Sequence, residues 1–268
     1  MSGFAWGAFG LNAAVAAGAA LAVMLITFAV AVARGLHRIV DVAWGLGFAA
    51  VAAASYAVSA ATGTGDPVRR ALALALTAAW GLRLAVHIAR RGGGHGEDPR
   101  YERMLARAPG NRNAYALRKI YLLQGALVWL VSLPVQAACH VDAGAGPVTY
   151  AGAVVWLAGL VFEAVGDHQL ARFKSDPAHH GVIMDRGLWS WTRHPNYFGD
   201  FLVWWGLFMM VCDSWQAAAL TVVSPVVMSL LLTRGSGVAL LERHMADRPG
   251  WKEYTARTPA FFPRPPRR

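Results

Sequence analysis

Seven long apolar stretches run through this chain of 268 residues, and they constrain its fold more than any other feature. A helix needs roughly 20 mostly apolar residues to cross about 30 Å of hydrocarbon. Apolar residues make up 56% of the sequence, and the mean hydropathy is +0.38, which exceeds what a soluble domain of this size buries. We therefore predict an all-α, polytopic membrane helix bundle. Its spans are expected at about 9–33, 39–61, 71–89, 120–139, 148–166, 198–211 and 215–232.

Neither an internal repeat nor a linker divides the sequence, so we expect a single integral membrane domain over residues 1–268. The first span is too long for a cleaved signal peptide and has no basic leading segment. The span at 198–211 is the shortest of the seven. The polar segment from Arg234 onward is expected to form a tail in the cytosol.

Positive charge is distributed unevenly between the connections, and this asymmetry predicts the topology. Of the 25 Lys and Arg residues, 22 fall in the connections after spans 1, 3, 5 and 7, whereas only Arg69 and Arg70 fall on the other side. Cytosolic loops collect Lys and Arg. The pattern favours an odd number of spans, with the N-terminus outside and the C-terminus in the cytosol of what we expect to be a bacterial inner membrane. Much of the net charge of +10 is then explained by topology, so no nucleic-acid partner is expected.

Ionisable residues inside the apolar stretches are the first candidates for a functional site, because burying each of them costs roughly 2.5–3.5 kcal/mol. These ionisable residues are Asp41, Arg83, His87, Glu163, Asp167 and Asp200. In the topology above, all of them except Arg83 fall near the cytosolic ends of their helices. Arg83 and His87 are four residues apart and share a helix face, as do Glu163 and Asp167. The simpler alternative is that these groups only extend toward the interface and contact water or loop cations.

A second candidate is the segment GLWSWTRHPNYFGD at 187–200, which places several polar residues at a membrane entrance. Pro195 suits the first turn of a helix, where its missing N–H is not needed. Arg193 and His194 would then stand at a helix N-terminus, which favours a phosphate group. Arg172 and Lys174 lie in the preceding connection and add two cations. These cations are equally compatible with a role in topology alone, but topology does not require Asn196, Tyr197 and Asp200 beside them.

The tail contains Glu242, Tyr254 and two segments bounded by proline, which indicates an ordered cap over the cytosolic mouth. An amphipathic segment lying on lipid is the alternative. No metal site is expected, because the His spacing matches no known box. The two cysteines, Cys139 and Cys212, exclude a disulfide scaffold and leave one possible pairing.

Several strings resemble a bacterial membrane family of unknown function (domain of unknown function 1295) that is related to the steroid 5-alpha-reductases. The strings are DVAWGLGF, WGLRLAVHI, GEDPRY, LLQGALVWLVSLPVQ, GDHQLARFK, GLWSWTRHPNYFGDFLVWWG, SGVALLE and YTARTPAFFP. The resemblance extends from about Arg38 to Pro263. The sequence is also similar, more widely, to the sterol reductases and the isoprenylcysteine carboxyl methyltransferases.

The resemblance implies a bundle that holds NADPH at its cytosolic end and a lipophilic enone between its helices. Carried over by position, the cofactor contacts would include Asp167, Lys174, Arg193, Asn196, Tyr197, Asp200, Glu242 and Tyr254. Glu163, Arg172 and His194 join this set from the residue patterns described above. The animal steroid reductases bind the substrate carbonyl through a Glu on the second helix and a Tyr on the third, and this sequence has no such Glu.

The expected reaction is conjugate reduction, in which negative charge develops on the carbonyl oxygen and a proton donor stabilises it. His87, which stands near the position of that Tyr, is the expected donor, supported by Arg83 or Asp41. One alternative is a membrane methyltransferase that uses S-adenosylmethionine, which carries no phosphate. Another is a lipid-binding or transport protein without catalytic activity. The Arg172, Lys174 and Arg193 set favours NADPH, whereas the substrate and the oligomeric state stay open.

Overall fold

The computed structural model describes residues 3–92, 96–235 and 237–266, and this part of the chain is helical with one isolated β-bridge between Phe4 and Val141. The prediction of an all-α fold is confirmed over these residues. The chain divides into two compact units, residues 1–149 with 210–221 and residues 150–209 with 222–268. Each unit is described separately below.

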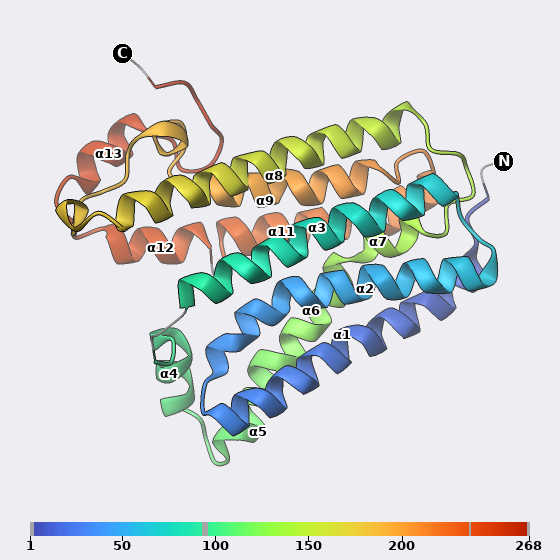
Figure 1. Cartoon of the computed structure of the whole chain (residues 1–268), viewed down its shortest axis with the longest axis horizontal. Coiled ribbons are helices and arrows are strands. Elements are labelled where there is room, and N and C mark those ends of the chain that lie inside the picture. The colour runs from blue at the N-terminus through green and yellow to red at the C-terminus, as the bar shows by residue number, and fades with distance from the viewer. Residues whose placement is uncertain (1–2, 93–95, 236, 267–268) are drawn as a thin grey trace. The chain divides into compact units, whose positions relative to one another are not determined.

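The first unit is built on three long helices, α1 (Trp6–Arg34), α2 (Val40–Thr62) and α3 (Pro67–Gly92), which run side by side (Figure 1). Its shorter helices are η1 (His37–Ile39), α4 (Pro99–Ala106), α5 (Arg112–Ala116), the π-helical turn η2 (Leu117–Tyr121), α6 (Leu122–Val131), α7 (Leu133–Ala138) and α10 (Trp215–Thr221). Small residues let α2 and α3 approach closely, since a Cβ at Gly45 would lie 2.2 Å from the carbonyl oxygen of Gly81.

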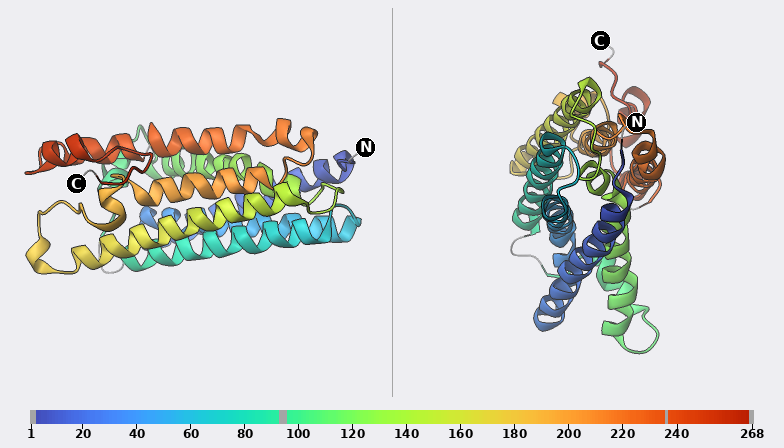
Figure 2. Two further views of the ribbon diagram at one scale, coloured as in Figure 1. Left: turned by 90° about the horizontal axis from the view of Figure 1, so that it is seen from above. Right: turned by 90° about the vertical axis from the view of Figure 1, so that its right-hand side faces the viewer.

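The second unit contains α8 (Pro147–Lys174), α9 (Pro195–Met209) and α11 (Val223–Thr233), which run in nearly the same direction in two views (Figures 1 and 2). Its shorter elements are η3 (Pro177–His179), η4 (Gly187–Ser190), α12 (Val238–Met245) and α13 (Trp251–Arg257). The indole N–H of Trp205 donates to Ser229 Oγ at 3.2 Å and joins α9 to α11.

Five helices among the described residues are long and apolar enough to cross a membrane, so the chain has the build of an integral membrane protein. They cover Trp6–Arg34, His37–Thr62, Pro67–Gly92, Pro147–Lys174 and Trp215–Thr233. The expected span at 120–139 is instead divided between α6 and α7. The expected span at 198–211 corresponds to α9, which has 15 residues and begins at Pro195 as predicted. The count of seven and the orientation of the termini therefore stay predictions.

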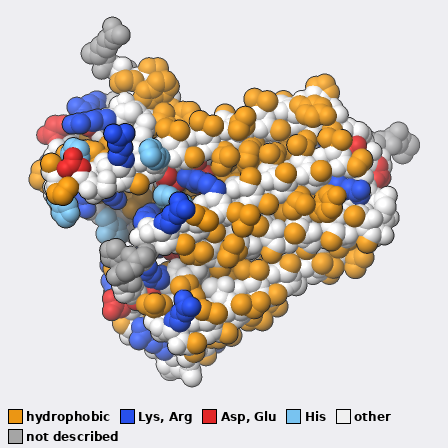
Figure 3. Space-filling view, viewed as in Figure 1, with side chains coloured by type: hydrophobic (Ala, Val, Ile, Leu, Met, Phe, Trp, Pro, Cys, Tyr) orange, Lys and Arg blue, Asp and Glu red, His pale blue; other side chains and the backbone are white. Residues whose placement is uncertain are grey.

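Side chains are distributed as a lipid environment requires. Figure 3 shows hydrophobic side chains over the long helical stretches, with most charged side chains and histidines gathered at helix ends. Large apolar side chains such as Ile26 and Val154 are exposed by about two thirds. Lipid tails are as apolar as these side chains, whereas exposing them to water costs free energy.

The end of the first unit that carries Arg69 is tightly closed by polar contacts. Arg69 lies within α3 and is fully buried, whereas the sequence placed it in a loop. Its Nη2 donates to Asp213 Oδ2 at 2.7 Å and to Thr149 Oγ1 at 3.0 Å. The chain start is joined to the same end, because the amide of Ala5 donates to the carbonyl of His140 at 3.1 Å. Cys139 and Cys212 are both free thiols.

Candidate functional site

The three residues predicted to be catalytic all lie in the first unit. Asp41 is in the first turn of α2, and Arg83 and His87 are half-buried in α3 one turn apart. A Cβ at Gly45 would approach both Gly81 and the amide nitrogen of Ala85, so the start of α2 lies against the second half of α3. Asp41 and His87 therefore occupy the same end of this helix pair.

The carboxylate of Asp41 is engaged by α4 and the residues around it. Arg100 Nη2 donates to Asp41 Oδ2 at 2.8 Å, and the Tyr101 hydroxyl donates to Asp41 Oδ1 at 2.5 Å. Burial and the neighbouring Asp41 carboxylate raise the pKa of Tyr101, which keeps its hydroxyl protonated as a donor. Asp41 thus anchors the polar connection that follows α3, in addition to any role in chemistry.

Sequence reasoning missed Glu97, which holds the same connection in place. Its carboxylate accepts from the backbone amides of His37 at 2.5 Å and Arg38 at 2.8 Å, which begin η1. The Arg38 guanidinium donates in return to the carbonyl of Gly96 at 2.8 Å. Both Glu97 and Tyr101 lie in the string GEDPRY, which is one of the strings that carry the family resemblance. Their partners lie about 60 positions earlier in the chain, and no pattern in the sequence links residues so far apart.

Most residues predicted to bind the cofactor lie in the second unit, along the seam between α8 and α9. Glycines bring these helices close together, since a Cβ at Gly199 would lie 2.4 Å from the amide nitrogen of Glu163 and 2.5 Å from the carbonyl oxygen of Gly159. Small residues at such contacts are typical of packed membrane helices. The seam therefore depends on glycine at positions that the predicted spans did not single out.

A row of polar side chains is buried at one end of this seam. Glu163 is 3% exposed, Asp167 is 7% exposed and Asp200 is 9% exposed. The Asn196 amide donates to Asp167 Oδ1 at 3.1 Å and links the two helices. Among the described residues no group of three His, Cys, Asp or Glu side chains has the arrangement of a metal site. The row thus combines three carboxylates, which accept hydrogen bonds, with the donating amide of Asn196, and burying such polar groups inside a span is costly.

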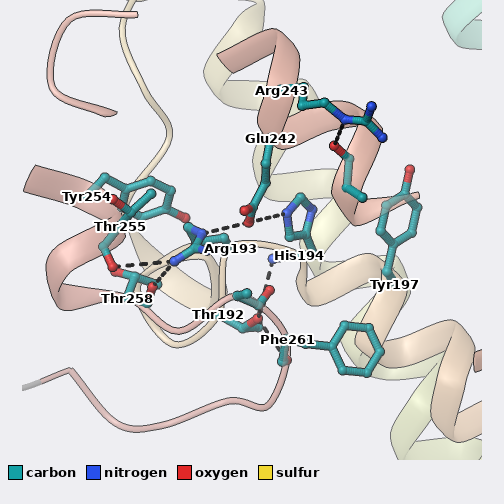
Figure 4. Close-up of polar contacts among 12 residues, drawn as sticks. Thr192, Arg193, His194, Tyr197, Glu242, Arg243, Tyr254, Thr255, Thr258 and Phe261 are labelled. Carbon is teal, nitrogen blue, oxygen red and sulfur yellow. Dashed lines mark hydrogen bonds and ion pairs between the residues drawn. The ribbon is translucent and has the colours of Figure 1, made fainter. Parts of the chain in front are cut away.

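Arg193, His194 and Glu242 form a compact cluster at the start of α9 (Figure 4). Arg193 Nε donates to Glu242 Oε1 at 2.8 Å, and His194 Nε2 donates to the same oxygen at 3.1 Å. Burial lowers the pKa of His194 even though Glu242 acts in the opposite direction. Burial alone would raise the pKa of Glu242, but Arg193 and His194 hold that pKa below its usual value.

The tail folds around the segment that leads into α9, as Figure 4 also shows. The Arg193 Nη1 donates to the carbonyl of Thr258 at 2.6 Å, and its backbone amide donates to the carbonyl of Pro259 at 2.9 Å. The Tyr254 hydroxyl donates to the carbonyl of Trp189 at 2.6 Å. Arg193 and Tyr254 therefore both hydrogen-bond within the protein, and their predicted contacts with a cofactor stay predictions. The described part of the tail contains the helices α12 and α13, whereas a cap over the cytosolic mouth stays a prediction.

The remaining candidates lie around this cluster. The Tyr197 ring stacks on His194 with 5.7 Å between the ring centroids. Arg172 and Lys174 are exposed in the last turn of α8. The structure thus gathers the predicted cofactor residues in the second unit and the predicted catalytic residues in the first.

Comparison with known proteins identifies a family but no characterised relative. Neither a curated protein nor a solved structure matches the chain. Residues 27–258 match the family described as "Protein of unknown function (DUF1295)", and the match includes both the α2–α4 region and the α8–α13 region described above. Because this match covers most of the sequence, the chain belongs to the DUF1295 family.

Proposed function

We propose that this protein is a membrane oxidoreductase that reduces a carbon–carbon double bond of a lipophilic enone with NADPH. The observation that carries the proposal is the row of buried carboxylates, Glu163, Asp167 and Asp200, between α8 and α9, with the half-buried Asn196 bound to Asp167. Apolar helices rarely contain so many buried polar groups unless those groups bind a substrate, a cofactor or an ion. Within the described residues no metal arrangement accounts for them.

The residues of the second unit fit the chemistry of NADPH. Carboxylate and amide groups in the row suit the hydroxyls of ribose and the amide of nicotinamide. The exposed Arg172 and Lys174 at the end of α8 suit phosphate, the first as a planar fork and the second as a point charge. When bound, this cofactor supplies the hydride, and the protein supplies orientation and electrostatics.

Arg193 takes a different role in this proposal from the one that its sequence context indicated. Its guanidinium donates to the Glu242 carboxylate and to the carbonyl of Thr258, so Glu242 balances its positive charge. We therefore assign Arg193 to positioning the tail and the start of α9, and we assign phosphate contacts to Arg172 and Lys174.

The proton required at the substrate carbonyl is assigned to His87, from its place in the sequence and its half-buried position in α3. A protonated imidazole stabilises the negative charge that develops on that oxygen in the transition state. Arg83, one turn away, favours that charge as well. Asp41 contributes by fixing Arg100 and Tyr101 beside the start of α2.

S-adenosylmethionine is the second candidate cofactor, and the internal pairing of Arg193 is the observation that favours it. Because Arg193 forms an ion pair with Glu242, fewer of the predicted cations are left to bind phosphate, and S-adenosylmethionine carries no phosphate group. The same polar row would then bind its ribose and amino acid groups. The product would be a methylated lipophilic substrate in place of a reduced one.

Parallel titration of the purified, detergent-solubilised protein with NADPH and with S-adenosylmethionine separates these functions. The proposal predicts saturable binding of NADPH within the range of typical enzyme KM values, about 1 μM to 1 mM. Saturable binding of S-adenosylmethionine alone would establish the methyltransferase instead. Binding of neither would support a lipid-binding protein without this chemistry.

A further inference from the structure

An apolar groove lies on the surface of the first unit between α1 and α6. Its volume is about 310 Å³, and its lining is Ala17, Leu21, Leu122, Gly125, Ala126 and Trp129. This volume falls at the lower end of the ~300–1,000 Å³ found for small-molecule sites. Both helices are apolar along the groove, as expected of helices that contact hydrocarbon.

The floor and the ends of the groove are well defined by packing. Small side chains form the floor, and Met24 packs beneath it, with its Cγ 3.4 Å from the position of a Cβ at Gly125. The Trp129 indole N–H donates to the carbonyl of Ala13 at 2.9 Å and closes one end with its ring. Leu122 lies at the other end of the lining, and the preceding residue, Tyr121, packs against Phe28 with 5.1 Å between the ring centroids.

Two exposed cations stand just beyond the Tyr121 end. Arg118 and Lys119 lie in the π-helical turn η2, directly before Leu122 at the start of α6. Single π-helical turns are rare and occur frequently at functional sites. Arg118 precedes Leu122 by four residues, so it lies about one turn past the end of the groove along the same helix.

We propose that this groove holds one chain of an anionic phospholipid, with the lipid headgroup on Arg118 and Lys119. The groove is lined by apolar and small side chains, and Arg118 and Lys119 are exposed beyond its Tyr121 end. The Glu97 carboxylate also lies near Tyr121, but it already accepts from the backbone amides of His37 and Arg38. Basic positions between membrane helices recognise anionic lipid headgroups in this way. The site is separate from the polar row of the second unit and does not depend on the proposed reaction.

A second copy of the chain is the competing occupant, because small residues also favour helix–helix contact. The two cations decide between these occupants. A copy of the same strongly basic chain would bring further positive charge to this surface, whereas an anionic headgroup complements Arg118 and Lys119.

Native mass spectrometry of the delipidated protein tests this site. The protein is incubated separately with palmitoyl-oleoyl phosphatidylglycerol, with phosphatidylcholine carrying the same chains, and with glycerol 3-phosphate as a headgroup without chains. We expect one retained phosphatidylglycerol, weaker retention of phosphatidylcholine and no retention of glycerol 3-phosphate. Equal retention of the two phospholipids would overturn the headgroup assignment, and retention of glycerol 3-phosphate would overturn the groove as the acyl site.

Two pairs of variants locate the lipid. Ala126→Trp fills the groove and should abolish retention, whereas Ala158→Trp, an exposed alanine of α8, should not. The double substitution Arg118→Gln with Lys119→Gln should lower the apparent affinity for phosphatidylglycerol by about thirtyfold, because each of the two cations contributes about five- to sixfold near a membrane surface. The matched control is Arg248→Gln with Lys252→Gln, two exposed cations of the tail. Equal retention by Ala126→Trp and Ala158→Trp, or conversion of a dimer to a monomer by Ala126→Trp alone, would contradict the proposal.

Discussion

Arg193 and Glu242 form an ion pair with 2.8 Å between Nε and Oε1, and this pair joins the start of α9 to α12 across 49 positions of sequence. The Arg193 side chain is 11% exposed and that of Glu242 is 25% exposed. His194 donates to the same carboxylate oxygen, so one acceptor holds two successive residues. The pair explains how a polar tail is fixed to the helix that carries Asn196 and Asp200.

Glu242→Gln should therefore loosen the tail. The substitution leaves the mostly buried Arg193 without a charge partner, and we expect a loss of about 1–3 kcal/mol in the free energy of unfolding. Thermal unfolding in detergent and limited proteolysis after Val238 measure the effect. Asp185→Asn, which removes the partner of the exposed Arg257, serves as the control and should change stability by less than about 1 kcal/mol. Equal effects of the two substitutions would remove Glu242 from this role.

Gly199→Ala should disrupt the seam between α8 and α9. The new methyl group would meet backbone atoms of Glu163 and Gly159 at 2.4–2.5 Å, and backbone cannot move aside as a flexible side chain does. We expect a destabilisation of about 3 kcal/mol, measured by thermal unfolding. Gly18→Ala is the matched control, because nothing lies within 4 Å of a Cβ at that position of α1. That control should be neutral or slightly stabilising, by up to about 1 kcal/mol. Tolerance of Gly199→Ala would show that the helices are not in close contact.

Acid should destabilise the end of the first unit that carries His140. Burial lowers the pKa of His140 from 6.5 to about 4, and its Nδ1 bonds with Thr64 Oγ1 at 2.9 Å. Between these two pH values the unfolded chain binds a proton that the folded chain does not. The stabilisation is thus complete above pH 6.5 and is lost as the pH falls toward 4, by up to about 3 kcal/mol.

Comparison of the wild-type protein with His140→Gln isolates this contribution, because other groups titrate equally in both. The difference in free energy of unfolding between the two proteins should change between pH 6.5 and 4 and stay constant above pH 7. A difference that does not vary over pH 4–6.5 would mean that His140 is not buried in its neutral form.

His87→Phe should separate cofactor binding from turnover. Under the proposed function, we expect the affinity for NADPH to stay within a factor of two and turnover of a lipophilic enone to fall by about 10²–10⁴-fold, the usual contribution of general acid catalysis. Single-turnover oxidation of NADPH, followed by its absorbance, provides the measurement. Arg91→Gln, at an exposed position one turn further along α3, is the control and should leave the rate unchanged. Unchanged turnover in His87→Phe would remove that residue from the mechanism.

The sequence predicted the parts of the fold that depend on local pattern. Apolar length located the long helices α1, α2, α3 and α8, and Pro195 begins α9 as its missing N–H allows. The breaks were harder to predict, because α6 ends at Val131 and α7 begins at Leu133 inside one apolar run. A single serine, Ser132, is too weak a signal to mark that break, and Pro134 is compatible with a first helical turn as well as with a kink.

The candidate site was predicted only in its residue types. Buried carboxylates at Glu163 and Asp167 followed from their cost inside a span, and the structure places them on one seam with Asn196 and Asp200. The pairing of Arg193 with Glu242 and of Asp41 with Tyr101 joins residues 49 and 60 positions apart. Such long-range partners depend on tertiary packing, so composition and spacing identified the cations without revealing which ones the fold itself binds.

Titration of NADPH against a matched pair of variants tests whether the end of α8 and the polar row beside it bind an anionic nucleotide, as we propose. Arg172→Gln with Lys174→Gln removes the two exposed cations of α8, and Arg248→Gln with Lys252→Gln removes one Arg and one Lys from the tail. We expect NADPH binding to weaken by about tenfold or more in the first variant alone, since charge-assisted contacts to phosphate are lost. Equal affinity in both variants, or binding of S-adenosylmethionine in place of NADPH, would contradict this proposal.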